Sequence, residues 1–207
     1  MKKLILICLA FTSSLFAQNN TSNIPKKSPN LDTITLGGGC YWCVEAVYEN
    51  LIGVQSVISG FSGGNTTNPT YNEVTTGNTG HAESIQITYD KNITSLDEIF
   101  KVFFTVHDPT TLNRQGADEG TQYRSVIFYK NAAQKSAAQS IINTLNKEKV
   151  YSRPIVTTLE PYTKFYKAPE YHQNYYENNK TQRYCQMVIQ PKLEKFEKVF
   201  KDRLKKK

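Results

Sequence analysis

The sequence predicts an α+β fold in which helices pack on a mixed β-sheet as a two-layer sandwich with a ferredoxin-like core. Apolar residues alternate over short runs typical of strands, and these runs take turns with helical patterns from residue 31 onward. Glycine and proline clusters separate the runs. The chain has 207 residues, of which 39% are hydrophobic and 21% charged. These values suit one domain with a single buried core.

Three segments outside the predicted main domain (31–190) differ from it in composition. Residues 1–17 carry two lysines, an apolar run and a closing alanine, which indicates a secretory signal peptide. An uncleaved membrane anchor is the alternative, so we expect a protein that is exported, to the periplasm, or tethered to a membrane. Residues 18–30 are polar and predict a disordered linker, and residues 191–207 predict a basic C-terminal helix or tail. The net charge of +7 accompanies no nucleic-acid-binding motif, so we expect no nucleic-acid partner.

Periodicity and turn residues define the elements of the first half. Apolar residues spaced as on one helix face precede Gly53, which ends that helix. Ser95 is a suitable N-cap for the next helix. The predicted elements are a strand at Asp32–Leu36, a helix at Cys43–Ile52, a strand at Val54–Gly60, a polar loop at Phe61–His81, a strand at Glu83–Tyr89 and a helix from Ser95 to Val106.

The second half continues the alternation of strands and helices. A second polar loop comes first, and the closing segments are rich in aromatic and then in basic residues. The predicted elements are a loop at Asp108–Gln122, a strand at Tyr123–Tyr129, an amphipathic helix at Ala132–Lys147, a strand at Ile155–Glu160, a short aromatic helix at Pro169–Asn178 and an exposed basic helix at Pro191–Lys207.

The stretch Gly37–Glu45 reads Gly-Gly-Gly-Cys-Tyr-Trp-Cys-Val-Glu and is the strongest candidate site. Its first cysteine, Cys40, is predicted between a strand and a helix, where helix N–H groups stabilise a thiolate and lower a thiol pKa. A Cys40–Cys43 disulfide would close a very small loop and add little stability. A zinc site needs four ligands, and only Cys185 and three histidines remain outside the leader. A redox or nucleophilic role is therefore favoured, with no metal and no cofactor.

Further candidate groups lie in the two polar loops. Glu83 follows a glycine turn at the edge of a strand, where a solvated strand end and a proton-transfer role are equally well supported. His81 is expected to hold its loop by hydrogen bonding. Asp118, Tyr123 and Arg124 cluster before a strand, a pattern that turn chemistry with a surface salt bridge also explains. The G-x-S-x-G match around Ser62 lacks the helix that a hydrolase nucleophile requires, so we interpret it as chance.

Taken together, these segments resemble the A-type peptide methionine sulfoxide reductases over Asp32 to Lys192. The resemblance rests on four motifs in the right order: Gly-Gly-Gly-Cys-Tyr-Trp, Thr-Gly-His-Ala-Glu, Ala-Asp-Glu-Gly-Thr-Gln-Tyr-Arg-Ser and Glu-Tyr-His-Gln. It implies that Cys40 is the nucleophile and Glu83 the acid. It also implies supporting catalytic roles for Tyr71, Asp118 and Tyr123, and substrate-binding roles for Tyr41 and Trp42. Tyr41 stands where the family more often has phenylalanine.

The implied chemistry is the reduction of methionine S-sulfoxide, free or in proteins, to methionine. Cys40 would attack the sulfoxide sulfur while Glu83 protonates its oxygen, which leaves a cysteine sulfenic acid. For Glu83 to act near neutral pH, burial must raise its pKa. Cys185 or Cys43 would then resolve the sulfenic acid, and a thioredoxin-like reductant would restore the thiols. We expect a monomer that repairs oxidised exported proteins.

Two other functions remain open at this level. A thioredoxin-like thiol–disulfide oxidoreductase would use Cys40 and Cys43 directly, although the Cys-Gly-Pro-Cys type of motif is missing. A binding module for oxidised or methionine-rich exported proteins would keep its biological effect after Cys40→Ser.

Overall fold

The computed structural model describes residues 28–206. The predicted signal peptide and residues 18–27 of the predicted linker lie outside this range. Residue Asn30, just ahead of the first strand, donates its backbone N–H to Asp90 Oδ1 at 3.0 Å. Among residues 28–206, no helix has the length and apolar character needed to cross a membrane.

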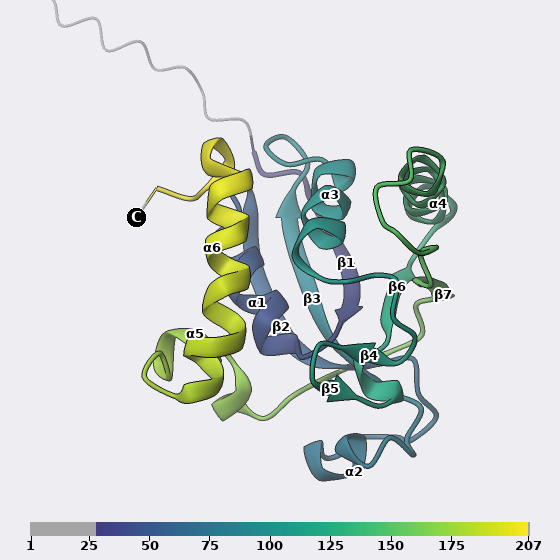
Figure 1. Cartoon of the computed structure of the whole chain (residues 1–207), viewed down its shortest axis with the longest axis vertical. Helices are drawn as coiled ribbons and strands as arrows, with labels where there is room; N and C mark the ends of the chain where they lie inside the picture. The colour runs from purple at the N-terminus through teal and green to yellow at the C-terminus, as the bar shows by residue number, and fades with distance from the viewer. Residues whose placement is uncertain (1–27, 207) are drawn as a thin grey trace, which may run out of the picture.

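A mixed six-stranded sheet forms the centre of the molecule (Figure 1). Its strand order is β7-β6-β1-β3-β2-β8, and every neighbouring pair is antiparallel except β6 and β7. A separate two-stranded ribbon joins β4 and β5. The strands are β1 Leu31–Gly38, β2 Val54–Ser62, β3 Ala82–Asp90, β4 Arg114–Gln115, β5 Asp118–Glu119, β6 Ser125–Tyr129, β7 Thr158–Pro161 and β8 Phe165–Lys167.

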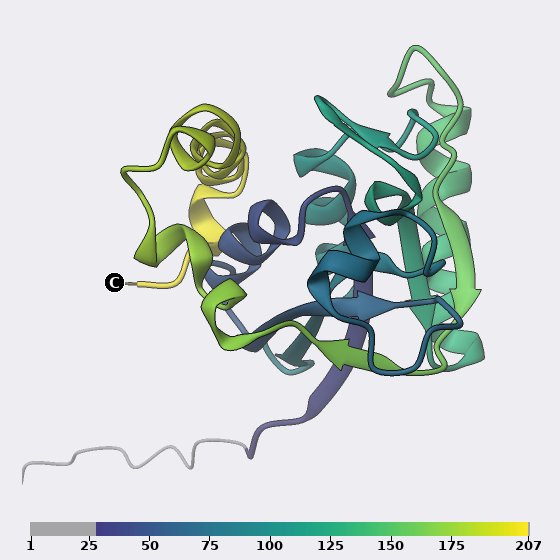
Figure 2. The same ribbon diagram turned by 90° about the horizontal axis from the view of Figure 1, so that it is seen from below.

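Helices α1, α3 and α6 lie together over one face of the sheet, as Figures 1 and 2 show. Helix α4 extends this layer past α3 and contributes Ala138 and Ile142 to the same core. The α+β prediction with helices on a mixed sheet is confirmed. The helices are α1 Tyr41–Glu49, α2 Tyr71–Thr75, α3 Leu96–Val106, α4 Ala132–Lys147, α5 Tyr175–Asn178 and α6 Gln190–Val199, with 3₁₀ turns η1 Thr121–Tyr123, η2 Glu170–His172 and η4 Lys201–Arg203 and a π-helical turn η3 Cys185–Ile189.

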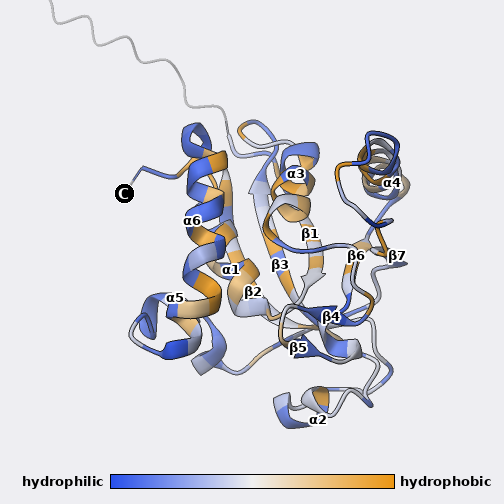
Figure 3. Ribbon diagram, viewed as in Figure 1, coloured by the Kyte–Doolittle hydropathy of each residue, from blue (hydrophilic) through white to orange (hydrophobic). Residues whose placement is uncertain are grey.

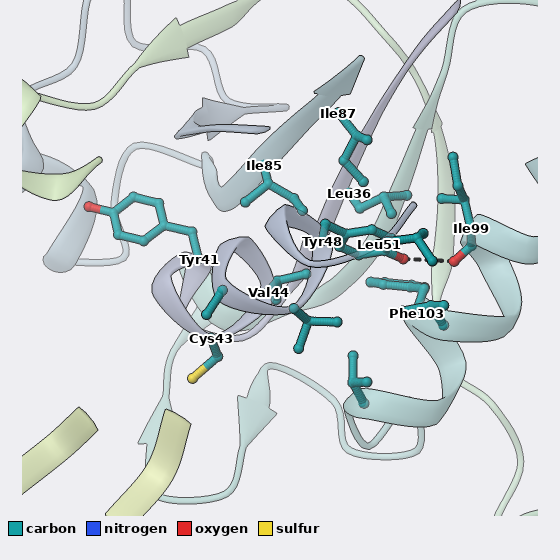
Figure 4. Close-up of a cluster of buried hydrophobic side chains, with 14 of the residues drawn as sticks. Leu36, Tyr41, Cys43, Val44, Tyr48, Leu51, Ile85, Ile87, Ile99 and Phe103 are labelled. Atoms are coloured by element: carbon teal, nitrogen blue, oxygen red, sulfur yellow. Dashed lines mark hydrogen bonds between the residues drawn. The ribbon is translucent and has the colours of Figure 1, made fainter. Parts of the chain in front are cut away.

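The main core lies between the sheet and α1 (Figure 4). Alternate residues of β1 and β3 point to the same side, and the register sets Leu36 opposite Ile85. These side chains are fully buried. At the far end of α1, the Tyr48 hydroxyl donates to the Ile99 carbonyl at 2.7 Å, so α1 is fixed against both the sheet and α3.

Several predicted boundaries were wrong, and two of them affect the site. Helix α1 begins at Tyr41, two residues before the predicted start, which makes Cys40 its N-cap residue. Tyr123 belongs to the 3₁₀ turn η1, and strand β6 begins only at Ser125. The predicted helix over 169–178 is two short turns, because Asn174 adopts a left-handed conformation (φ 50°) between them.

The predicted basic C-terminal helix is present as α6, but it ends at Val199 and also has a buried apolar side. Leu193 and Phe196 of α6 are buried on an apolar stripe, which Figure 3 shows among hydrophilic residues. Beyond α6, the chain pairs with the end of α1: Ile52 donates its N–H to the Arg203 carbonyl at 2.8 Å, and Leu51 forms a β-bridge with Leu204.

Candidate active site

Cys40 lies in the short connection between the end of β1 and the start of α1. Gly39 makes the connecting turn with φ +87°, and a Cβ atom there would come within 2.5 Å of the Gln115 side chain, so only glycine fits. Cys40 follows as the N-cap residue and is 6% exposed. Its carbonyl accepts from the Cys43 N–H at 3.2 Å. The predicted location at a strand-to-helix junction is therefore confirmed.

Glu83 lies beside Cys40 at the start of β3 and is 2% exposed. Its Oε2 accepts from the backbone N–H of Tyr41, the first residue of α1, at 3.1 Å. Burial raises the pKa of Glu83 to about 8, and the hydrogen bond from Tyr41 only partly opposes this rise. Glu83 is thus a buried carboxylic acid that holds its proton at neutral pH. The requirement of a raised pKa for this residue is met, and burial is the cause.

The two thiols nearest to Glu83 share a hydrogen bond. Burial raises the pKa of Cys40 well above its ordinary value, and negative charge on Cys43 and Glu83 raises it further. The hydrogen bond from Cys40 lowers the pKa of Cys43 to about 7. The expected lowering of the Cys40 pKa at the start of the helix is therefore not found, because burial of the thiol raises its pKa.

Tyr71, Tyr123 and Asp118 come from three separate loop elements and converge on the same site. Tyr71 opens α2, and burial followed by the charge of Glu83 raises its pKa to about 12. Burial and the charges of Glu83 and Asp118 likewise raise the pKa of Tyr123. Both phenols therefore keep their protons and act as hydrogen-bond donors.

The aromatic pair after Cys40 is part of a larger cluster. Tyr41 is fully buried, and its hydroxyl lies 2.9 Å from Nδ1 of His172. Trp42 stacks on Tyr175, with ring centroids 3.7 Å apart and an angle of 9° between the planes. It also lies parallel to His172, at 5.4 Å. One face of the predicted substrate-binding tryptophan is thus covered by Tyr175.

Cys185, the other candidate resolving thiol, is fully buried at the start of η3. Burial raises its pKa, and negative charge on Cys43 adds to this effect. Its neighbour Tyr184 donates a hydrogen bond from its hydroxyl to Asp118 Oδ2 at 3.0 Å, and the same hydroxyl lies 4.0 Å from Cys43 Sγ. The thiols of Cys40, Cys43 and Cys185 are all free.

Sequence reasoning assigned no role to Glu45, His172, Tyr175 or Tyr184. Glu45 is buried and accepts from the backbone N–H groups of Asn174 (3.1 Å) and Tyr175 (3.3 Å), which joins α1 to α5. A carboxylate within an apolar helix was the available signal for Glu45. For His172, the signal was its place in the Glu-Tyr-His-Gln motif.

The remaining candidates are structural. His81 accepts from the Gly64 N–H through Nδ1 at 3.1 Å, and its Nε2 lies 2.8 Å from the Thr66 carbonyl, so it holds its loop as predicted. Ser62 donates to the Lys164 carbonyl. Arg124 pairs with Glu160 at 3.3 Å. Over residues 28–206, no three His, Cys, Asp or Glu side chains are grouped as metal ligands.

Comparison with known proteins identifies the family. The family model for peptide methionine sulfoxide reductase matches residues 32–204. The chain belongs to this family. It is 51% identical over 175 residues to the peptide methionine sulfoxide reductase MsrA of Saccharolobus solfataricus, covering 84% of this chain and 98% of that protein. It is 47% identical over 193 residues to MsrA of Deinococcus radiodurans, covering 93% of each.

Solved structures agree with this assignment. The reduced form of Mxr1 from Saccharomyces cerevisiae has a TM-score of 0.68 and 32% identity, over 75% of this chain and 89% of that one. Methionine sulfoxide reductase A of Corynebacterium diphtheriae has a TM-score of 0.64 and 34% identity, over 74% and 77%. This member is a peptide-methionine (S)-S-oxide reductase of the A type, and its family favours sulfoxide reduction over the thioredoxin-like alternative.

Proposed function

We propose that this reductase acts through nucleophilic attack of Cys40 on the sulfoxide sulfur, with Glu83 as the proton donor. The observation that carries the proposal is the buried, protonated Glu83, held by the Tyr41 N–H next to Cys40. A sulfoxide oxygen leaves readily only after protonation, and a carboxylic acid with a pKa of about 8 supplies that proton at neutral pH.

The thiol proton has an acceptor in Cys43. Cys43 shares a hydrogen bond with Cys40, so it lies where it can take the thiol proton as Cys40 bonds to sulfur. Tyr71 and Tyr123 donate hydrogen bonds to the oxygen as negative charge develops there. The hydroxyl group of the protonated sulfoxide then passes from the substrate sulfur to the Cys40 sulfur as the bond between the two sulfurs breaks. Methionine leaves as the reduced thioether, and Cys40 is left as a sulfenic acid.

The substrate methyl group binds against the aromatic pair. Because Tyr175 covers one face of Trp42, the methyl group contacts the remaining exposed part of the indole, beside Tyr41. Asp118 has a supporting role, since its hydrogen bond holds the Tyr184 hydroxyl close to Cys43.

Recycling proceeds through the other two cysteines. Cys43 attacks the Cys40 sulfenic acid, which releases water and leaves a Cys40–Cys43 disulfide. Cys185 then attacks Cys43 and frees the Cys40 thiol. A thioredoxin-like dithiol reduces the Cys43–Cys185 disulfide and supplies the two electrons. The existing contact between Cys40 and Cys43 and the complete burial of Cys185 support this order.

The protein works outside the cytoplasm as a monomer and repairs oxidised exported proteins. The support is the leader-like composition of residues 1–17. Cell fractionation, with N-terminal sequencing of the mature protein, distinguishes cleavage after Ala17 from an uncleaved membrane anchor.

The central experiment measures turnover of the S and R epimers of a methionine sulfoxide peptide with dithiothreitol as reductant. Wild type should reduce the S epimer alone, Cys40→Ser should be inactive, and Glu83→Gln should be strongly impaired. Equal activity in the three proteins would rule out the proposed mechanism.

A further inference from the structure

A groove of about 420 Å³ opens next to the candidate active site, between the start of α2 and the turn η2. Its volume lies within the range of about 300–1,000 Å³ typical of small-ligand sites. Its lining residues are Pro69, Thr70, Tyr71, Asn72, Lys167, Pro169 and Tyr171. In Figure 2, α2 and the segment after β8 lie side by side at this end of the molecule.

The groove and the candidate active site share one residue, Tyr71. Tyr71 lines the groove and also interacts electrostatically with Glu83 and Cys40. The His172 ring packs 4.4 Å from Tyr71 and 4.3 Å from Tyr171, measured between ring centroids, and is parallel to Trp42. The groove is therefore close enough to the site to receive a side chain that neighbours a methionine sulfoxide bound at Cys40.

Both walls of the groove are fixed before any substrate binds. On one side, a capping box holds α2: the Thr70 hydroxyl accepts from the Glu73 N–H, and the Glu73 carboxylate accepts from the Thr70 N–H at 2.7 Å. On the other side, the buried Gln173 amide bonds to both the N–H and the carbonyl of Ser59. Little ordering cost is left for binding.

The chemistry of the groove favours an apolar or aromatic occupant. The Tyr171 side chain is 70% exposed, so most of its ring is available to contact a ligand in the groove. Two prolines and two tyrosines supply most of the lining. The one charged lining residue, Lys167, is paired with Glu170 at 2.8 Å.

We propose that this groove is a substrate subsite that receives an apolar or aromatic side chain flanking methionine sulfoxide in an unfolded polypeptide. The inference rests on the proposed binding of the sulfoxide at Cys40. It makes the enzyme selective for oxidised methionines in apolar sequence, such as core segments exposed on damage.

The test compares kcat/KM, with dithiothreitol as reductant, for S-sulfoxide peptides in which methionine sulfoxide is flanked by phenylalanine, alanine or aspartate. Wild type should favour the phenylalanine peptide over the alanine peptide by about fivefold to tenfold, through KM, since a half-open groove buries part of one aromatic side chain. Tyr171→Ser should bring this ratio close to one. Val199→Ser, a change at an exposed apolar residue of α6, should keep the wild-type ratio.

A second variant reverses the preference. Asn72→Glu places a negative charge in the groove, so peptides flanked by lysine should gain over those flanked by phenylalanine. The subsite is disproved by a wild-type ratio near one, by a preference for aspartate, or by a Tyr171→Ser protein with the wild-type ratio. N-acetylated methionine S-sulfoxide separates the two proposals, because it has no flanking side chain to enter the groove. Failure to reduce it would contradict the mechanism at Cys40 without testing the groove.

Discussion

At the scale of single residues, burial decides the protonation of the site more than the helix dipole does. Cys40 is the N-cap residue of α1, but its side chain makes no capping hydrogen bond, and burial raises the pKa of its thiol. Even with the hydrogen bond from the Tyr41 N–H, Glu83 has a pKa of about 8, because desolvation outweighs one hydrogen bond. The Glu83 carboxyl group therefore holds a proton at neutral pH, as its proposed role as proton donor requires.

The pH dependence of the reaction tests this assignment. Glu83 must be protonated to act, so kcat/KM should fall as pH rises through about 8. Glu83→Gln should lower kcat by about 10²–10⁴-fold and lose this alkaline limb, because the amide does not titrate. Glu119→Gln, at an exposed carboxylate of β5, is the matched control. An alkaline limb that survives in Glu83→Gln assigns the titration to another group.

The hydrogen bond between the Tyr41 hydroxyl and His172 should stabilise the fold at this site. Tyr41→Phe leaves Nδ1 of the buried His172 without its partner, which should cost about 1–3 kcal/mol of unfolding free energy. Urea denaturation measures the loss. In a double-mutant cycle with His172→Phe, the two changes together should cost less than their sum. Strict additivity would show that the hydrogen bond contributes nothing.

At the scale of elements, strong periodicity predicted well and short irregular segments did not. Helix α4 matches its predicted range because alanines and amphipathic spacing dominate locally. The five-residue helix α2 was missed inside a polar loop, although Thr70 and Glu73 form a capping box that reads as a helix start. The π-helical turn at Cys185–Ile189 has no local sequence signal.

The two cysteines that we propose as resolving thiols lie in different elements. Cys43 lies in the first turn of α1 near Cys40, whereas Cys185 is buried at the start of η3, where its thiol interacts electrostatically with Cys43. After one turnover without reductant, mass mapping of Cys185→Ser should find a Cys40–Cys43 disulfide. Cys43→Ser should accumulate sulfenic acid and recycle slowly with thioredoxin. Recycling at the wild-type rate in Cys43→Ser contradicts the relay.

At the scale of the whole molecule, the C-terminal segment closes the fold. Residues 203–205 bond to the end of α1, and Arg203 also forms an ion pair with Glu98 of α3. A chain that ends at Val199 loses these contacts, which together contribute on the order of 2–4 kcal/mol. Its Tm should fall by roughly 5–15 °C in thermal unfolding. Deletion of residues 206–207 alone is the control, and equal Tm values for the two truncations would contradict a closing role.

From the sequence, only those site residues that belong to recognisable motifs could be predicted. The order of four motifs pointed to Cys40 and Glu83, and the structure places these residues together. Contacts between distant segments carry no pattern in one sequence. Tyr184 reaches Asp118 across 66 positions, and Glu45 reaches Asn174 across 129. The residues that surround and support the site are therefore brought together by tertiary packing, which one sequence does not reveal.

The direction of β1 also decides how an anchored form of this enzyme would present itself. The strand enters at Leu31 and delivers the chain to Cys40 after its eight residues, about 25 Å away at roughly 3.3 Å per residue. A bead or fusion partner joined ahead of Leu31 therefore attaches at the end of β1 that lies away from the thiol. Immobilisation through the N-terminus should leave the candidate active site accessible from solution to large, unfolded polypeptides.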